Sequence, residues 1–274
     1  MENNFILGLH EAGIHDIGRV GGKNASLGEM IQKLSTLGIR IPSGFIITVS
    51  AYEDFISFNQ LDEKISSLVS EIDYESIESL RRAGLQIRGM IRNSKFQPDL
   101  SKMIIEAYYR LSRDYGQEIT DVAVRSSATA EDLPDASFAG QQETYLNVRG
   151  PAALMDAVRN CFASLFTDRA ISYRQNFGYD HFAVGISICI QKMVRSDLGS
   201  SGVAFSLDTE SGFKDAVVIN GIFGLGELIV QGSISPDEFI VFKPLLNKDY
   251  IPIIEKKLGL KDQMMVYGDD PDER

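Results

Sequence analysis

The hydrophobic pattern of the chain changes near residue 120, and this change restricts the folds that the chain can adopt. Before that point, apolar residues recur at the three- and four-residue spacing of amphipathic helices, as in the stretches 27–37 and 100–111. After it, apolar residues fall in short runs typical of β-strands. The sequence therefore predicts an α+β protein with a mostly helical first lobe, residues 1–120, and a sheet-rich second lobe, residues 121–245.

Individual elements can be placed within these two halves. One strand is expected in the helical half, at residues 44–48, with Ser50 as the N-cap of the helix that follows. A helix at 152–166 divides the strands of the second half, and residues 246–274 are expected to form a partial third segment or a linker. The strands expected in the second half span residues 122–125, 144–148, 184–194, 201–205, 216–220 and 238–242.

The expected strand at 184–194 has two unlike faces. Large apolar side chains occupy its even positions from 184 to 190, whereas smaller or more polar side chains occupy the odd positions. Because successive side chains of a strand point to opposite faces, we expect the apolar face to pack inward and the other face to line a cleft. The residues of that second face are Gly185, Ser187, Cys189 and Gln191.

The composition excludes several classes of protein. The 274 residues are 44% hydrophobic and 24% charged, so the chain can bury a core, and its net charge of −11 excludes a nucleic-acid-binding protein held by bulk positive charge. The absence of a signal peptide and of a run of about 18 apolar residues argues against a membrane role. Cys161 and Cys189 lie far apart in apolar runs, which indicates reduced thiols in a cytoplasmic protein.

Residues 21–26, Gly-Gly-Lys-Asn-Ala-Ser, are the first candidate for a phosphate site. The two glycines allow the backbone to approach a ligand, the start of the following helix offers unpaired N–H groups, and Lys23 adds a positive charge. The segment is not a P-loop, because Ile17 and Asn24 stand where that motif needs Gly and Ser or Thr. An ordinary turn with an exposed lysine is the alternative interpretation.

The second candidate is Arg125 and the segment that follows it. Arg125 ends an expected strand, and about twenty residues rich in small and hydroxyl side chains separate it from the next strand. An arginine held at a strand end can pair bidentately with phosphate oxygens, and loops of this length are uncommon unless they serve a function. The alternative is a long exposed loop with an incidental arginine.

Other polar residues give weaker signals. The amide of Gln191 beside flat apolar neighbours could bind an adenine ring, although from the residues alone a glutamine that faces water is favoured. The glycine-rich segment 220–227 lacks the spacing of a dinucleotide-binding motif. His10, His15 and His181 show neither metal-ligand nor catalytic-triad spacing.

Three segments taken together, 20–30, 125–144 and 193–206, resemble one superfamily. The stretch Arg-Ser-Ser-Ala-Thr-Ala-Glu-Asp at 125–132, followed by Ser-Phe-Ala-Gly-Gln at 137–141, is specific to the phosphoenolpyruvate-utilising dikinases. The sequence therefore resembles the N-terminal ATP-binding region of these enzymes, which include phosphoenolpyruvate synthase (pyruvate, water dikinase), pyruvate phosphate dikinase and rifampin phosphotransferase. Segments 170–174, 208–213 and 230–239 favour the synthase family.

The resemblance implies an ATP-grasp-type nucleotide-binding domain with ATP between two α+β lobes, truncated at its C-terminus. It implies that Lys23 and Arg125 bind the phosphates and that Gln191 lines the nucleotide pocket. It also implies that the loop at Gly140 and Thr144 closes over the phosphates. It also implies Mg²⁺ as a cofactor, with metal ligands expected beyond residue 274.

The activity implied by the resemblance is a phosphotransfer of gluconeogenesis. ATP phosphorylates a histidine on a separate swivelling domain, which passes the phosphoryl group to pyruvate, so that ATP, pyruvate and water yield AMP, phosphoenolpyruvate and phosphate. Pyruvate and the swivelling domain would meet this chain through downstream domains, and the fragment alone is not expected to turn over. Two alternatives stay open: the ATP-binding domain of a related dikinase with another acceptor, and a nucleotide-binding module without catalysis.

Overall fold

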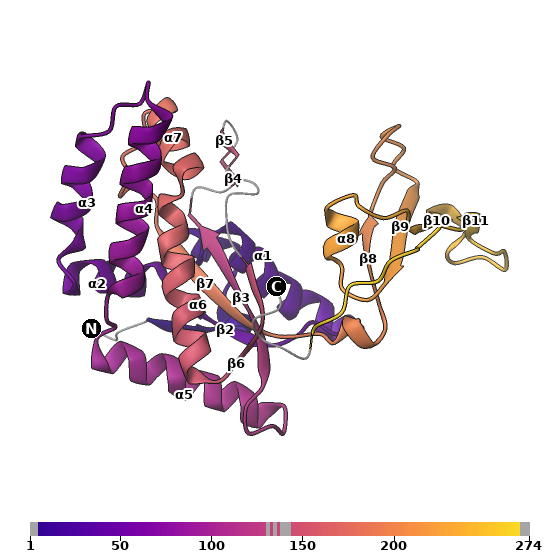
Figure 1. The fold of residues 1–274 in the computed structure, drawn as a ribbon. Coiled ribbons are helices and arrows are strands. Elements are labelled where there is room, and N and C mark those ends of the chain that lie inside the picture. The colour runs from indigo at the N-terminus through magenta and orange to yellow at the C-terminus, as the bar shows by residue number, and fades with distance from the viewer. Residues whose placement is uncertain (1–4, 130–131, 134–135, 138–143, 269–274) are drawn as a thin grey trace. The chain divides into compact units, whose positions relative to one another are not determined.

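The computed structural model describes residues 5–129, 132–133, 136–137 and 144–268 of the chain (Figure 1). Helices and strands both contribute extensively, which confirms the expected α+β class. The chain divides into two compact units, Met1–Met193 and Val194–Arg274. No helix in the described ranges is long and apolar enough to span a membrane.

The first unit is built on a five-stranded antiparallel sheet of order β1-β2-β7-β3-β6. Strand β7 is central and pairs with β2 from the helical half of the sequence and with β3 from the other half. The sheet thus joins strands from both sides of residue 120. The strands are β1 (Ile6–Gly8), β2 (Gly44–Ile47), β3 (Asp121–Ala128), β6 (Thr144–Arg149) and β7 (Ile186–Lys192), and a separate hairpin is formed by β4 (Asp132–Leu133) and β5 (Ala136–Ser137).

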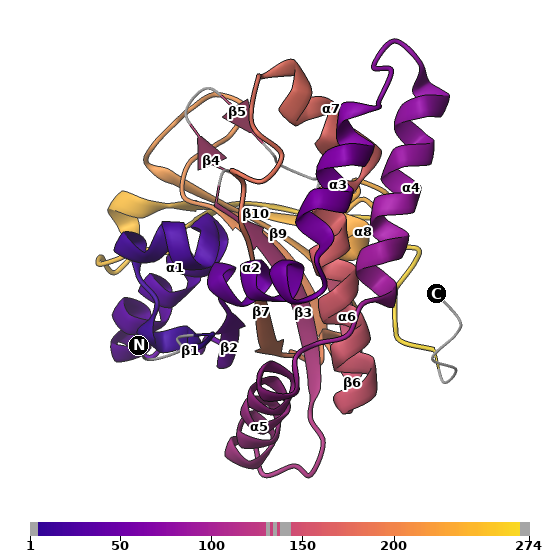
Figure 2. The same cartoon turned by 90° about the vertical axis from the view of Figure 1, so that its left-hand side faces the viewer.

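Helices cover both faces of this sheet, with α1 on one face and α6 on the other (Figure 2). The larger core lies on the α6 face, where the rings of Phe55 and Phe162 pack with their centroids 5.3 Å apart. The helices are α1 (Ile17–Leu34), α2 (Val49–Phe58), α3 (Leu61–Ser70), α4 (Ile77–Asn93), α5 (Pro98–Asp114), α6 (Pro151–Ala163) and α7 (Asp168–Asn176), with short 3-10 turns η1 (Leu9–Glu11), η2 (Ile14–Asp16), η3 (Ser35–Leu37) and η4 (Ser164–Phe166).

Two local predictions for this unit are wrong. Thr48, not Ser50, is the N-cap of α2, so that Ser50 lies in the first helical turn. The small face of β7 does not line a cleft at Ser187 and Cys189, because both side chains are buried beneath α1. Small side chains at these positions allow the helix to approach the sheet closely, which is the packing reason for the pattern.

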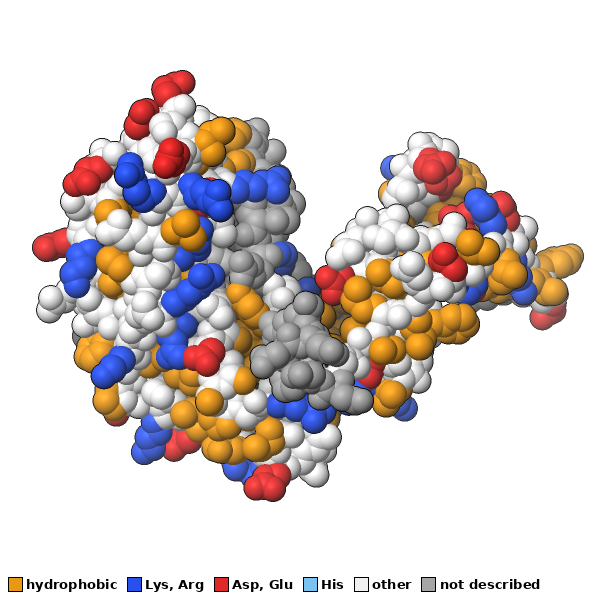
Figure 3. Space-filling model, in the orientation of Figure 1, with side chains coloured by type: hydrophobic (Ala, Val, Ile, Leu, Met, Phe, Trp, Pro, Cys, Tyr) orange, Lys and Arg blue, Asp and Glu red, His pale blue; other side chains and the backbone are white. Residues whose placement is uncertain are grey.

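The second unit contains a four-stranded antiparallel sheet of order β11-β10-β9-β8. Its buried cluster is small and consists of Ile222, Leu228 and Ile234. Large apolar side chains remain at its surface, as Figure 3 shows, and Phe223 is 54% exposed. The elements are β8 (Ser200–Phe205), β9 (Ala216–Phe223), α8 (Glu227–Val230), β10 (Asp237–Phe242) and β11 (Ile253–Lys257), with 3-10 turns η5 (Ser196–Leu198) and η6 (Lys243–Leu245).

Candidate functional site

The Gly-Gly-Lys segment forms a sharp turn within α1. Gly21 has a φ of 74° and a ψ of 163°, which is not helical and which only glycine adopts without strain. A Cβ at this position would lie 2.3 Å from Ser127 Oγ and 2.6 Å from the Ser127 carbonyl oxygen. Both the conformation and the packing therefore require glycine, and the turn lies directly against strand β3.

Lys23 lies in the first helical turn after this break, as the sequence predicts. Its side chain is exposed, whereas Gly22 and Asn24 on either side are buried. The backbone N–H groups at the start of a helix carry a partial positive charge, which adds to the charge of the lysine. This arrangement suits an anion that approaches from solvent.

The prediction that Arg125 ends its strand is wrong, because β3 continues to Ala128. Arg125 lies in the middle of β3 and is the exposed residue of a strand whose other side chains are buried. Thr144 on β6 is directly opposite it, and Cys189 on β7 is opposite on the other side. Burial raises the pKa of the Cys189 thiol to about 12, against the opposing effect of the positive charge of Arg125. The thiol therefore stays protonated at neutral pH and is not a nucleophile.

Gln191 is buried near the end of β7, which lies between β2 and β3 in the sheet. It pairs in register with Ala123 and with Gly44, and its Nε2 donates a hydrogen bond to the Pro42 carbonyl oxygen at 3.0 Å. A Cβ at Gly44 would lie 2.2 Å from the Ile190 carbonyl oxygen, so glycine is needed for this strand pairing. The interpretation that Gln191 faces water, favoured by the residues alone, is wrong because the side chain is 8% exposed.

The structure brings most of the predicted site residues to one face of the sheet. Residues directly opposite one another on neighbouring strands share a face, as do alternate residues of one strand. Thr144, Arg125 and Cys189 form one row across β6, β3 and β7, and Gln191 follows Cys189 on the same face. Helix α1, which carries Lys23, packs over this face at β3 and β7. Gly140 lies outside the described residues.

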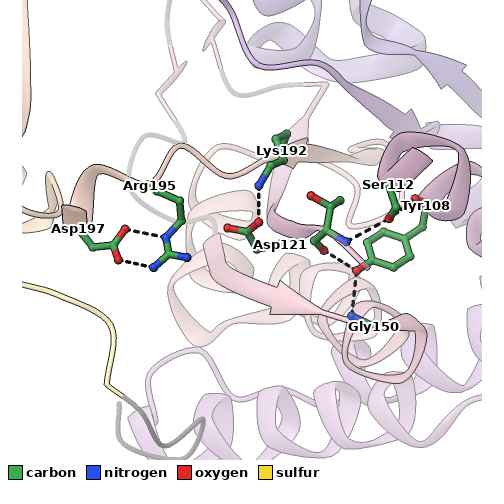
Figure 4. Close-up of polar contacts among 8 residues, drawn as sticks. Tyr108, Ser112, Asp121, Gly150, Lys192, Arg195 and Asp197 are labelled. Carbon is green, nitrogen blue, oxygen red and sulfur yellow. Dashed lines mark hydrogen bonds and ion pairs between the residues drawn. The ribbon is translucent and has the colours of Figure 1, made fainter. Parts of the chain in front are cut away.

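Strand β3 is anchored at its beginning by a polar network that the sequence did not reveal (Figure 4). Lys192 Nζ forms an ion pair with Asp121 Oδ1, and both side chains are largely buried. The Tyr108 hydroxyl donates to the Thr120 carbonyl oxygen at 2.5 Å and accepts a hydrogen bond from the Gly150 N–H at 2.9 Å. These bonds fix β3 four residues before Arg125.

A second unpredicted network surrounds Ser187. Its hydroxyl accepts a hydrogen bond from Asn24 Nδ2 at 2.9 Å and lies within donating distance of the carbonyl oxygens of Val20 and of Ser127, the latter at 3.2 Å. Asn24 follows Lys23 in the segment 21–26, and Ser187 lies on the smaller face of the strand at 184–194, so the sequence singles out both segments. Their contact joins positions 163 residues apart, which local spacing does not indicate.

Metal binding has no support from side-chain clusters. Across residues 5–129 and 144–268, no three His, Cys, Asp or Glu side chains are grouped to hold an ion. His181 instead accepts a hydrogen bond at Nδ1 from Arg174 Nε, at 3.1 Å, which gives this histidine a structural role.

Comparison with known proteins identifies similar sequences along almost the whole chain. The family model described as pyruvate phosphate dikinase, AMP/ATP-binding domain, matches residues 17–273. Proteins named phosphoenolpyruvate synthase are similar: that of Aquifex aeolicus is 58% identical over 264 residues, 96% of this chain and 31% of the relative. That of Synechocystis sp. is 53% identical over 97% of this chain and 33% of its own length. That of Escherichia coli is 51% identical over 98% of this chain and 34% of its own length. The chain thus spans about a third of the length of these relatives.

Proposed function

The chain belongs to the family of pyruvate phosphate dikinase AMP/ATP-binding domains, and on this basis we propose that it is the ATP-binding part of a phosphoenolpyruvate synthase. One observation carries the assignment of the site: the glycine turn before Lys23 packs on the strand that carries Arg125. The names of the relatives favour the synthase over the other dikinases as the whole protein.

In this proposal the triphosphate of ATP binds at the start of the helical segment after Gly21. Lys23 and Arg125 neutralise charge on the phosphate oxygens, and Thr144, opposite Arg125, contributes a hydroxyl at the same place. Gly140 would act in the loop between these strands, and Gln191 would line the pocket of the nucleotide. Phosphoryl transfer needs little covalent chemistry from the protein, so fixed cations and hydrogen-bond donors supply most of the catalysis.

We further propose that the domain has an ATP-grasp-type fold and that the phosphoryl group passes to a histidine outside this chain. His181 is half-buried and bonded to Arg174, which argues against its being the acceptor. The whole protein would then convert ATP, pyruvate and water to AMP, phosphoenolpyruvate and phosphate. Mg²⁺ would enter with the phosphates of ATP, and no residue described here is assigned to it.

Calorimetric titration of the chain with ATP in the presence of Mg²⁺ tests the site. We expect Lys23→Ala and Arg125→Ala each to weaken binding about 10- to 100-fold, since each removes a charge-assisted contact with phosphate. Lys33→Ala is the matched control, because Lys33 is an exposed lysine of the same helix and pairs with Glu29. Failure of the folded parent to bind ATP, or equal affinities in all variants, would contradict the proposal.

The activity is tested on the whole protein. Incubation with ATP and pyruvate is expected to yield phosphoenolpyruvate, AMP and free phosphate in equal amounts. In a parallel incubation with added phosphate, formation of pyrophosphate that depends on this phosphate would assign the whole protein to another member of the superfamily, as would no reaction with pyruvate as acceptor. Either result leaves the ATP site to be judged by the titration.

A further inference from the structure

The hydrogen bonds that Ser187 makes with Val20, Asn24 and Ser127, here called the Ser187 network, join three segments of the first unit. Val20 and Asn24 belong to α1, Ser127 to β3 and Ser187 to β7. Ser187 and Ser127 are fully buried and Asn24 is 2% exposed. Buried hydrogen bonds of this kind have well-defined geometry, since no water competes for the polar atoms.

The Ser187 network holds the glycine turn from both sides. The carbonyl of Val20 is part of the peptide bond to Gly21, and Asn24 is the residue directly after Lys23. Ser187 contacts both, so the residues between them, Gly21 to Lys23, are fixed at their two ends. The turn itself lies against Ser127, where a Cβ on Gly21 would clash.

The same network connects the glycine turn to β3, the strand that carries Arg125. Ser127 follows Arg125 by two residues and therefore faces the same side of the sheet. Ser187 lies opposite Ser127 in the pairing of β7 with β3, two residues before Cys189, which lies opposite Arg125. The backbone of the lysine turn and the backbone of Arg125 are thus connected through one buried hydroxyl.

We propose that Ser187 and Asn24 are positioning residues that set the place of Lys23 relative to Arg125 for binding of the ATP phosphates. The inference rests on the proposed function, because it assigns a role at the same site. Neither residue would touch the nucleotide. Two cations must match the spacing of adjacent phosphate groups, so a turn that shifts when the network is broken loses the contribution of Lys23 first.

A double-mutant cycle for ATP affinity separates positioning from general support of the fold. Ser187→Ala is expected to weaken ATP binding about tenfold in the parent but less than about twofold in a Lys23→Ala background, because the network acts through that lysine. Asn24→Ala is expected to give the same pattern. Ser164→Ala is the matched control: Ser164 is also a buried serine, bonded to the Cys161 carbonyl oxygen at 2.7 Å, and its loss should not change ATP affinity.

Circular dichroism establishes that each variant is folded, and Asn24→Ala decides the case if Ser187→Ala does not fold. Equal losses of affinity in the parent and in the Lys23→Ala background would overturn the positioning role, as would unchanged affinity in the single variants. In both cases a Lys23-dependent ATP site would stand. If the folded parent does not bind ATP, the proposed function fails and the positioning role fails with it.

Discussion

Arg174 is a fully buried arginine that holds the C-terminal part of the first unit together. Its Nε donates to His181 Nδ1, its Nη2 donates to the Leu165 carbonyl oxygen at 2.5 Å, and its guanidinium lies over the ring of Phe166. Burial lowers the pKa of Arg174 to about 10, which still leaves it charged at neutral pH. The arginine thereby connects α7 to the segment after α6 and to the loop that follows.

His181 makes the stability of this region depend on pH. Burial, together with the charge of Arg174, lowers the pKa of His181 to about 4, from about 6.5 in an unfolded chain. Between these two values the unfolded chain binds more protons than the folded chain, so the free energy of unfolding falls as the pH falls from about 6.5 to about 4. Protonation at Nδ1 would also remove the acceptor for Arg174.

We therefore expect His181→Gln to reduce the loss of stability between pH 7 and pH 4.5 by about 1–2 kcal/mol, a value discounted because the side chain is only half-buried. Urea unfolding at the two pH values measures it. His15→Gln is the control, since His15 is exposed. An identical pH dependence in the His181 variant and the parent would show that this histidine does not carry the effect.

At the scale of elements, local pattern located most strands of the sheets. Alternation and β-branched runs predicted the positions of β3, β6, β7, β8, β9 and β10, and these predictions are confirmed to within a few residues. The strands β1, β4, β5 and β11 were missed. The first three have only two or three residues and carry little periodic signal, and β11 lies in the segment expected to be a partial third segment or a linker. The pairing of β7 with β2 was also not predictable, since it joins Cys189 to Ile46, which are separated in the sequence by several helices and two strands of the same sheet.

At the candidate site, too, local sequence pattern does not indicate long-range contacts. The sequence indicated residue types that suit phosphate, Lys23 after two glycines and Arg125 on a strand, and the structure puts them on neighbouring elements. It could not indicate that Ser187 joins these elements, because that depends on how α1 crosses β7. Contacts of this kind follow from tertiary packing and leave no spacing in the sequence.

The turn in α1 offers a test of how closely this element fits the sheet. Gly21→Ala combines a left-handed φ with a Cβ only 2.3 Å from Ser127 Oγ, so we expect it to lower the free energy of unfolding by about 2–4 kcal/mol. Gly116→Ala is the matched control, because Gly116 has a φ of +66° but nothing within 4 Å of the added Cβ. It should cost only about 1–2 kcal/mol.

Chemical denaturation of the two glycine variants and the parent gives both values. Equal destabilisation by Gly21→Ala and Gly116→Ala would mean that backbone strain alone matters and that the turn does not press on β3. A larger cost at Gly21 would support the close packing from which the Ser187 network is argued.

The two units of the molecule differ in how much apolar surface they bury. The first unit has an extensive core on the α6 face of its sheet and a second one beneath α1. The cluster in the second unit has three buried members, while side chains such as Phe223, Val230 and Leu258 are largely exposed. Since burial of apolar surface is the main source of stability, we expect the first unit, considered by itself, to be more stable than the second.

The central position of β7 has a consequence for biosynthesis. A growing chain emerges with α1 and β2 first, but both remain without their central neighbour until residues 186–192 have been made. The glycine turn at position 21 likewise lacks its contact with Ser187 until that residue has been synthesised. At about 5–20 residues per second, Ser187 is synthesised roughly ten to thirty seconds after Gly21. During that interval the nascent segment exposes an unpaired strand edge and apolar helix faces, so we expect it to be prone to non-native association until translation has passed β7.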